Sequence, residues 1–287
     1  MRMLDVILLA LLGGLQAYSQ TLQANKVVIV GVDGLSTRAV AEGKTPRLHE
    51  LMERGAWTLK ARGVMPTVSS PNWASIVMGA GPESHGVDSN DWQPDKFLIA
   101  SVCPGDKHVF PTIFGVLRAA RPQAKIAVLH DWEGFGRLVE ERAPQRLEHI
   151  LKSPLAMKAA VEHWKKEKPD LLFVHLDDVD HAGHRYGWHT PEYFAAVAEA
   201  DTLIGNLMDA IGEEAAILVV SDHGGVGTKH GGLSMAELEV PWIAAGPGVA
   251  RGELKRPVYS LDTAPTAAKL LGIAPHACWT GRDVLSK

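Results

Sequence analysis

Short, continuous runs of apolar residues recur along the chain and predict the strands of a buried sheet. Runs rich in Val, Ile and Leu suit strands that are covered on both faces. They occur at residues 26–34, 124–130, 170–178, 215–225 and 240–246. Segments with a helical pattern lie between them, at residues 46–54, 71–79, 111–120, 154–167, 191–211 and 262–271. This alternation predicts an α/β sandwich with a mainly parallel central sheet flanked by helices.

Three of these predicted strands end in acidic or histidine residues. The first runs into Asp33, the third into the segment HLDDVDHAGH (175–184), and the fourth into Asp222-His223, with His230 soon after. An isolated Asp at a strand end is ordinarily a turn former, and a lone His is ordinarily structural. Three strand ends of the same kind favour a functional site instead, because working residues collect at the carboxyl ends of strands in open α/β sheets.

Composition and charge narrow the class of protein. The chain has 287 residues, of which 46% are hydrophobic, as in an ordinary globular enzyme. Its formal net charge is −4 and no long run of Lys or Arg is present, which argues against a nucleic-acid polymer as partner. No repeat or linker interrupts the pattern, so we expect one catalytic domain over residues 20–287.

The first residues, MRMLDVILLALLGGLQAYSQ, have the pattern of a secretory signal peptide over residues 1–19. The small residues Ala17 and Ser19 suit cleavage, and the protein would then be exported to the periplasm or the medium. A cytosolic protein with an apolar first helix or strand is the alternative. No other segment approaches the roughly 18 apolar residues that span a bilayer, so we expect no integral membrane association.

Cys103 and Cys278 are the only cysteines of the chain. An oxidising compartment would permit one disulfide between them. Two unpaired thiols in the core fit the sequence equally well.

The acidic and histidine residues at the strand ends match the ligands of divalent metal ions. Zinc sites commonly take three or four ligands from Asp and His. The chain offers six such side chains: Asp33, Asp180, His184, Asp222, His223 and His230. Together with a hydroxyl they suffice for two divalent ions, which can activate a nucleophile and neutralise charge in an in-line displacement.

Two adjacent serines, Ser69 and Ser70, lie between Pro66 and Pro71. A serine hydroxyl is a poor nucleophile until a base or a metal lowers its pKa, and the G-x-S-x-G motif is absent. A metal is therefore the favoured activator, with the amides at the start of the helix predicted over residues 71–79 facing a phosphate. The alternative is that both serines only cap that helix.

In their order and spacing these motifs resemble the type I phosphodiesterase/nucleotide pyrophosphatase family of the alkaline phosphatase superfamily. The matching segments are residues 30–34, 66–72, 79–87, 180–187 and 221–224 with His230, and the resemblance extends over residues 26–287. It implies an alkaline-phosphatase-like sandwich and a small phosphoester substrate. The activity it implies is metal-dependent hydrolysis of phosphodiester or pyrophosphate bonds through a phosphoseryl intermediate.

The resemblance also assigns roles to individual residues. Ser69 stands at the nucleophile position, and Asn90 stands where the family places an amide on a non-bridging phosphate oxygen. One zinc would be held by Asp33, Ser69, Asp222 and His223, and the other by Asp180, His184 and His230.

One ligand assignment has an alternative. Asp177 and His181 have the same spacing as Asp180 and His184, but only the later pair carries the glycine pattern of the family motif. We therefore expect Asp177 and His181 not to bind the metal themselves, but to position the ligands or to have a structural role. A short glycine-rich turn before His230 replaces the long insertion of larger relatives, so the preference for nucleotides is not carried over.

Other activities remain as alternatives. No Arg occurs between Arg62 and Arg118, whereas Trp73 and Trp92 offer flat apolar surfaces. This favours a diester or pyrophosphate over a phosphomonoester, whose extra charge usually needs a guanidinium. The alternatives are that both tryptophans belong to the core and that Arg185 or Lys229 reaches the site from another loop. A sulfatase would need Arg where Trp73 stands, and a non-catalytic binding protein would be expected to have lost ligands. The sequence identifies no protein partner.

Overall fold

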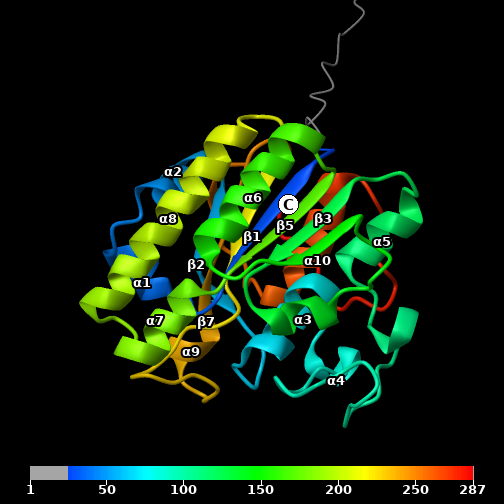
Figure 1. Ribbon diagram of the computed structural model, residues 1–287, viewed down its shortest axis with the longest axis horizontal. Coiled ribbons are helices and arrows are strands. Elements are labelled where there is room, and N and C mark those ends of the chain that lie inside the picture. The colour runs from blue at the N-terminus through cyan, green and yellow to red at the C-terminus, as the bar shows by residue number, and fades with distance from the viewer. Residues whose placement is uncertain (1–24, 287) are drawn as a thin grey trace, which may run out of the picture.

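The predicted apolar runs form the middle of one eight-stranded sheet in the computed structural model, which describes residues 25–286 (Figure 1). The strands are β1 (Val27–Val32), β2 (Ala56–Arg62), β3 (Ile126–His130), β4 (Arg146–His149), β5 (Leu171–Leu176), β6 (Ala216–Val220), β7 (Glu239–Ala245) and β8 (Gly252–Glu253). Their order across the sheet is β4-β3-β5-β1-β6-β7-β2-β8. Only β7 runs antiparallel to its neighbours, β6 and β2, so the sheet is mostly parallel, as expected.

Helices cover both faces of the sheet. One face carries α1 (Thr37–Glu42), α2 (Pro46–Arg54), α6 (Ser153–Glu167), α7 (Asp178–Tyr186) and α8 (Pro191–Ile211). The other carries α3 (Ser69–Met78), α5 (Ile113–Ala120) and α10 (Thr263–Leu271). Figure 1 shows α6 and α8 along one side of the strands and α5 and α10 along the other. Short helices α4 (Pro82–His85) and α9 (Met235–Leu238) and 3-10 helices η1 (Asp106–His108), η2 (Glu133–Leu138) and η3 (Ser260–Asp262) lie in the connections.

Each predicted strand and helix is present, with ends shifted by a few residues. β2 and α7 were not predicted. The side chains of β2 alternate between buried and partly exposed, so it lacks a continuous apolar run. α7 lies inside the polar segment that follows β5. The signal peptide expected over residues 1–19 lies outside the described residues.

The neighbouring strands β5, β1 and β6 bring together the three strand ends that carry acidic and histidine residues. β1 lies between β5 and β6 and runs parallel to both, with Val32 opposite Leu176 and Gly31 opposite Val220. Asp33, the segment leading into α7, and Asp222-His223 therefore leave the sheet at the same edge. Strand pairing alone places the predicted metal ligands near one another.

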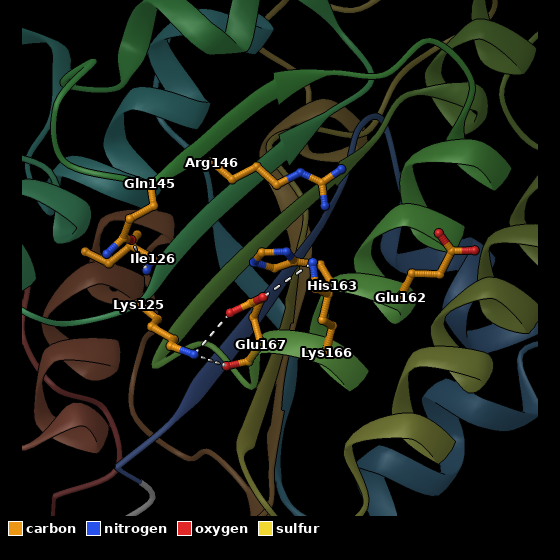
Figure 2. Close-up of a pocket in the computed structure, with 8 residues that line it drawn as sticks. All are labelled: Lys125, Ile126, Gln145, Arg146, Glu162, His163, Lys166 and Glu167. Atoms are coloured by element: carbon orange, nitrogen blue, oxygen red, sulfur yellow. Dashed lines mark hydrogen bonds and ion pairs between the residues drawn. The ribbon is translucent and has the colours of Figure 1, made fainter.

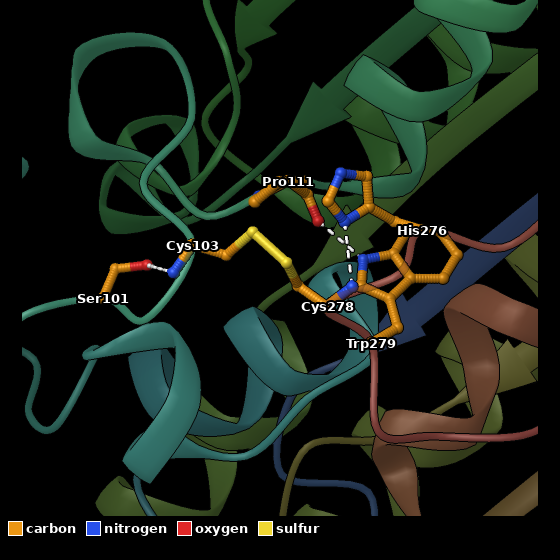
Figure 3. Close-up of a disulfide and its surroundings, with 6 residues drawn as sticks. All are labelled: Ser101, Cys103, Pro111, His276, Cys278 and Trp279. Carbon is orange, nitrogen blue, oxygen red and sulfur yellow. Dashed lines mark hydrogen bonds between the residues drawn. A yellow bond between two sulfur atoms is a disulfide. The ribbon is translucent and has the colours of Figure 1, made fainter.

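A disulfide joins Cys103 to Cys278, so of the two alternatives the structure has the bonded form (Figure 3). The next residue, Trp279, donates from Nε1 to the carbonyl of Pro111 at 2.8 Å. The amide of Thr280 donates to the carbonyl of Gly79, the residue that ends α3. The bond thus ties the loop between α4 and α5 to a C-terminal segment that also holds the end of α3.

At the opposite end of the sheet, a pocket lies where α6 ends and β3 begins (Figure 2). In it, Lys125 Nζ lies 3.1 Å from Glu167 Oε2, and Lys166 Nζ lies 3.8 Å from Glu167 Oε1. These charges pair with one another, and the pocket is separate from the residues at the carboxyl edge. Among the helices of residues 25–286, none combines the length and the apolar character needed to cross a bilayer.

Candidate metal centre and nucleophile

The residues that follow β1 and β6 form one cluster around His223. Its Nε2 lies 3.2 Å from Asp222 Oδ2, 3.5 Å from Asp33 Oδ1 and 3.4 Å from Ser69 Oγ. All four side chains are buried. The structure therefore gathers every residue that was expected at the first zinc.

A second cluster combines α7 with the loop after β6. Asp180 and His184 lie one turn apart on α7, with 3.3 Å between His184 Nε2 and Asp180 Oδ2. His230 Nε2 lies 3.1 Å from His184 Nε2 and 3.8 Å from Asp180 Oδ1. The rings of His223 and His230 stack with centroids 3.7 Å apart, so the two clusters are adjacent.

The three histidines point the same ring nitrogen into the clusters. Nδ1 of His223 lies 2.9 Å from the carbonyl of Gly224, that of His184 3.0 Å from Thr228, and that of His230 2.9 Å from Thr67. A carbonyl accepts only from N–H, so Nδ1 carries a proton, and in the neutral ring Nε2 keeps its lone pair. Backbone carbonyls orient metal-binding histidines in this way.

The carboxylates supply oxygens that no protein donor satisfies. Asp33 Oδ1, Asp180 Oδ1 and Asp222 Oδ2 are buried and have no hydrogen-bond partner among the described residues. Buried oxygens of this kind are rare unless an ion or water occupies the site. Carboxylate oxygens together with imidazole nitrogens are a donor set that fits zinc. The residues present therefore fit a pair of divalent cations.

The electrostatics of the chain alone show why a cation would be favoured. Burial and the negative charges of Asp33 and Asp177 raise the pKa of Asp180 to about 9. Burial, followed by the charge of Asp33, also raises the pKa of Asp222 well above its usual range. Burial lowers the pKa of His223 to about 4, so this imidazole is neutral and able to bind a metal. Crowded carboxylates that cannot all ionise alone can do so around divalent cations.

Asp33 is held by two residues that the sequence did not identify as partners. Trp73 donates from Nε1 to Asp33 Oδ2 at 2.9 Å, and His175 Nε2 lies 3.2 Å from the same oxygen. Burial alone would raise the pKa of Asp33, but the hydrogen bond with His175 and the nearby His223 hold it well below its usual range. These contacts leave Oδ1 of Asp33 facing the cluster. His175 begins the segment 175–184 that the sequence singles out, but it still lies within β5, so it was not expected to contact Asp33.

Of the two alternatives for Trp73 and Trp92, the structure has the core position and not a surface offered to the substrate. Trp73 is fully buried and Trp92 is 3% exposed. Trp73 packs edge-on against Phe173, with ring centroids 6.2 Å apart. Both tryptophans belong to the core, and Trp73 acts on the site through its bond to Asp33.

The loop before Ser69 is fixed by one buried side chain, Asn72. Its Nδ2 donates to the carbonyls of Val64, Pro66 and Val68 at 3.2, 3.1 and 2.9 Å. Its Oδ1 accepts from the amide of Val64 at 2.7 Å. Val68 is the N-cap of α3 and Ser69 is its first residue, so the alternative in which the serines cap the helix does not hold.

Asn90 lies beside the nucleophile loop. Its Oδ1 accepts from the amide of Ser70 at 2.8 Å, and its side chain is exposed. This bond leaves Nδ2, the donor that a phosphate oxygen needs, free of the helix.

Arg137 is a residue near the nucleophile that the sequence did not predict. It lies in η2 and donates from Nη2 to Ser70 Oγ at 3.0 Å and to the carbonyl of Asn90. The argument that no arginine lies near the nucleophile loop is therefore wrong.

Asp177 and His181 face each other next to the two clusters, and Asp177 also has a ligand atom within 4.8 Å of those of Asp33 and His175. His181 Nε2 lies 3.2 Å from Asp177 Oδ2, and the His181 side chain is 57% exposed. The amide of Asp177 is held by Ser153 Oγ at 3.0 Å. The pair with His230 beside it is the later one, Asp180 and His184, as the glycine pattern indicated.

Comparison with known proteins agrees with this geometry. The model of the family described as type I phosphodiesterase/nucleotide pyrophosphatase matches residues 27–243. An uncharacterized pyrophosphatase/phosphodiesterase of Schizosaccharomyces pombe is 26% identical over 248 residues, 76% of this chain and 48% of that protein. Human ectonucleotide pyrophosphatase/phosphodiesterase family member 1 is 28% identical over 196 residues, 63% of this chain and 21% of that protein. The chain thus spans about half or less of the length of these curated relatives.

Solved structures share the fold. Murine ectonucleotide pyrophosphatase/phosphodiesterase 5, an inactive variant in complex with AMP, superposes with a TM-score of 0.73 at 17% identity, covering 91% of this chain and 100% of that chain. A 2-O GAG sulfatase superposes with a TM-score of 0.69 at 17% identity, covering 89% of this chain and 72% of that chain. These likenesses confirm the alkaline-phosphatase-like architecture. With the family match over most of its described residues, this chain belongs to the type I phosphodiesterase/nucleotide pyrophosphatase family.

Proposed function

We propose that the protein is a metal-dependent hydrolase of phosphodiester or pyrophosphate bonds that acts through a phosphoseryl intermediate. The observation that carries the proposal is the surroundings of His223, whose Nε2 lies 3.4 Å from Ser69 Oγ. It lies beside buried carboxylate oxygens without partners, and the other two histidines that present Nε2 are in the adjacent cluster. Membership of the family supports the reaction class.

Two divalent cations, with zinc the best match to the donors, complete the proposed site. Asp33, Ser69, Asp222 and His223 would hold one ion, and Asp180, His184 and His230 the other. When bound, the ions would lower the pKa of the attacking hydroxyl and neutralise charge that develops on the phosphoryl group and leaving oxygen.

Ser69 Oγ is the proposed nucleophile. It attacks phosphorus in line, and the bond from phosphorus to the leaving oxygen breaks as the bond to Oγ forms. Asn90 Nδ2 donates to a non-bridging oxygen of the phosphoryl group. A water molecule then attacks phosphorus from the side opposite Ser69 Oγ. This step breaks the bond between phosphorus and Oγ, releases phosphate or a phosphomonoester, and restores Ser69.

His223 is poorly arranged to act as a general base in a Ser-His-Asp triad. In a triad the carboxylate orients the nitrogen of the imidazole that does not face the serine. Here the carbonyl of Gly224 takes that place, while Asp33 and Asp222 lie on the same side of the ring as Ser69. This arrangement suits a metal ligand.

We also propose a domain organisation for the chain and a cellular location for the protein. Residues 20–287 would form one catalytic domain, and residues 1–19 a signal peptide that directs export. The disulfide between Cys103 and Cys278 supports an oxidising compartment. Two relatives, 26% identical to this chain, are named venom phosphodiesterases of Crotalus adamanteus.

The test is to trap the intermediate on Ser69. Wild-type protein is mixed with bis(4-nitrophenyl) phosphate, quenched in acid, digested and analysed by mass spectrometry. We expect a peptide that contains Ser69 and carries a 4-nitrophenylphosphoryl group, because one aryl ester stays on phosphorus, and loss of both this peptide and turnover in Ser69→Ala. Ser260→Ala is the matched control, because Ser260 is also buried and its Oγ has no partner among the described residues. Full turnover in Ser69→Ala would refute the proposal.

A further inference from the structure

Packing in the hydrophobic core fixes the position of Arg137 near the nucleophile loop. Two residues earlier, Phe135 stacks on Phe173 with ring centroids 4.6 Å apart and packs edge-on against Trp73 at 6.0 Å. The guanidinium of Arg137 lies over the ring of Trp132, 5.6 Å from its centroid. These contacts fix η2 and aim its arginine at the start of α3.

The contacts of Arg137 link it to both residues next to the proposed phosphoryl position. Nη2 donates to Ser70 Oγ at 3.0 Å and to the carbonyl of Asn90. The amide of Ser70 in turn donates to Asn90 Oδ1 at 2.8 Å. Ser70 is the neighbour of Ser69, so the guanidinium contacts the residue next to the one that would carry the phosphoryl unit.

The positive charge of Arg137 is not neutralised by the protein. Within residues 25–286 it forms no ion pair with a carboxylate, and Asp91 and Glu133 act on it only as nearby charges. Its Nε is buried and lacks any hydrogen-bond partner in that part of the chain. Because Nε is buried and Nη2 already donates to Ser70 and Asn90, an anionic ligand would meet the guanidinium at Nη1 and balance its charge there.

We propose that Arg137 binds the substrate's additional negative charge and makes the site selective for phosphoryl groups more highly charged than a simple diester. This inference rests on the proposed hydrolysis of phosphoesters at Ser69 and specifies the charge of the substrate. A pyrophosphate lies within the proposed function, and a monoester is the alternative activity. A monoester dianion offers a third non-bridging oxygen, and a pyrophosphate offers a second phosphate. A diester with a neutral substituent offers neither, so its hydrolysis gains little from Arg137.

The experiment compares kcat/KM for 4-nitrophenyl phosphate, methyl 4-nitrophenyl phosphate and ADP in wild type, Arg137→Ala and Arg137→Lys. We expect Arg137→Ala to lower the value for a substrate with additional charge by roughly 10- to 100-fold, the worth of a charge-assisted hydrogen bond. The diester should change far less, and Arg137→Lys should recover part of the loss. A loss confined to the monoester identifies the third oxygen as the partner, and a loss confined to ADP identifies the second phosphate.

Arg118→Ala is the matched control. Arg118 lies on α5 and donates to the backbone carbonyls of Ala143 and Pro122, at 2.9 and 2.6 Å. Its removal should alter stability without altering the ratio between substrates. If Arg137→Ala lowers all three substrates equally, the residue only positions Ser70 and Asn90, and the inference is overturned.

Binding of inorganic phosphate, measured by calorimetry, separates this inference from the proposed function. We expect the dissociation constant to rise roughly 10- to 100-fold in Arg137→Ala. An unchanged constant would overturn the role of Arg137 even in an active enzyme. If wild type hydrolyses none of the substrates, the proposed function fails, and the phosphate titration still decides whether Arg137 binds the anion.

Discussion

Removing the side chain of Asn72 should loosen the nucleophile loop while leaving the metal ligands in place. Asn72 is fully buried, and its side chain hydrogen-bonds to the backbone of residues 64–68, directly before Ser69. Its two N–H groups are shared among three carbonyls, and its oxygen accepts one further bond. Each hydrogen bond is worth about 1 kcal/mol, and the half-buried carbonyls can recover part of their bonding from water. We therefore expect Asn72→Ala to lower the free energy of unfolding by about 2–4 kcal/mol.

The same change should slow catalysis. A displacement of about 1 Å at a reacting group can cost about 100-fold in rate, so kcat should fall roughly 10- to 100-fold. Asn72→Asp keeps the acceptor for Val64 but replaces the donor to three carbonyls with an oxygen, and should be at least as damaging. Asn206→Ala, at an exposed position of α8, should stay within about 0.5 kcal/mol of wild type.

The assay combines denaturant unfolding, kcat for an aryl diester, and bound metal per chain. We expect a lower midpoint with an unchanged slope, a lower kcat and unchanged metal content. A loss of stability with full kcat would refute the idea that Asn72 positions Ser69. A loss of metal in parallel with kcat would show that the loop supports the ligands instead.

Three further changes test separate parts of the account. Ser69→Thr should keep partial activity and Ser70→Ala should be milder than Ser69→Ala in steady-state rates; a more damaging Ser70→Ala would mean that the nucleophile is misassigned. Replacing Cys103 and Cys278 together by serine should lower the free energy of unfolding by about 2–5 kcal/mol, and equal denaturation curves would show that the disulfide contributes nothing. Mass analysis of protein made by the native host should find a new N-terminus near Gln20, and an intact first methionine would contradict export.

Much of the fold and the proposed metal centre was predictable from local sequence. Continuous apolar runs identify strands buried on both faces, and parallel strands bring their carboxyl ends to one edge. Asp33, Asp222 and His223 follow such runs directly, so their meeting follows from the order of the strands.

Arg137 and His175 were not predictable in this way. Arg137 meets Ser70, 67 positions earlier in the chain, only because Phe135 packs between two aromatic rings of the core. His175 lies within an apolar run, and only the neighbouring strand shows that it faces Asp33. The burial of Trp73 was not predictable for the same reason, because it depends on which distant parts of the chain pack against the ring.

Metal analysis of the purified protein tests the central claim most directly. Elemental analysis of wild type should find about two divalent ions per chain, and chelation should abolish turnover until zinc is restored. Asp222→Asn and His184→Ala should each bind fewer ions than wild type, because these residues belong to different clusters. Full turnover by protein free of divalent ions would contradict the account.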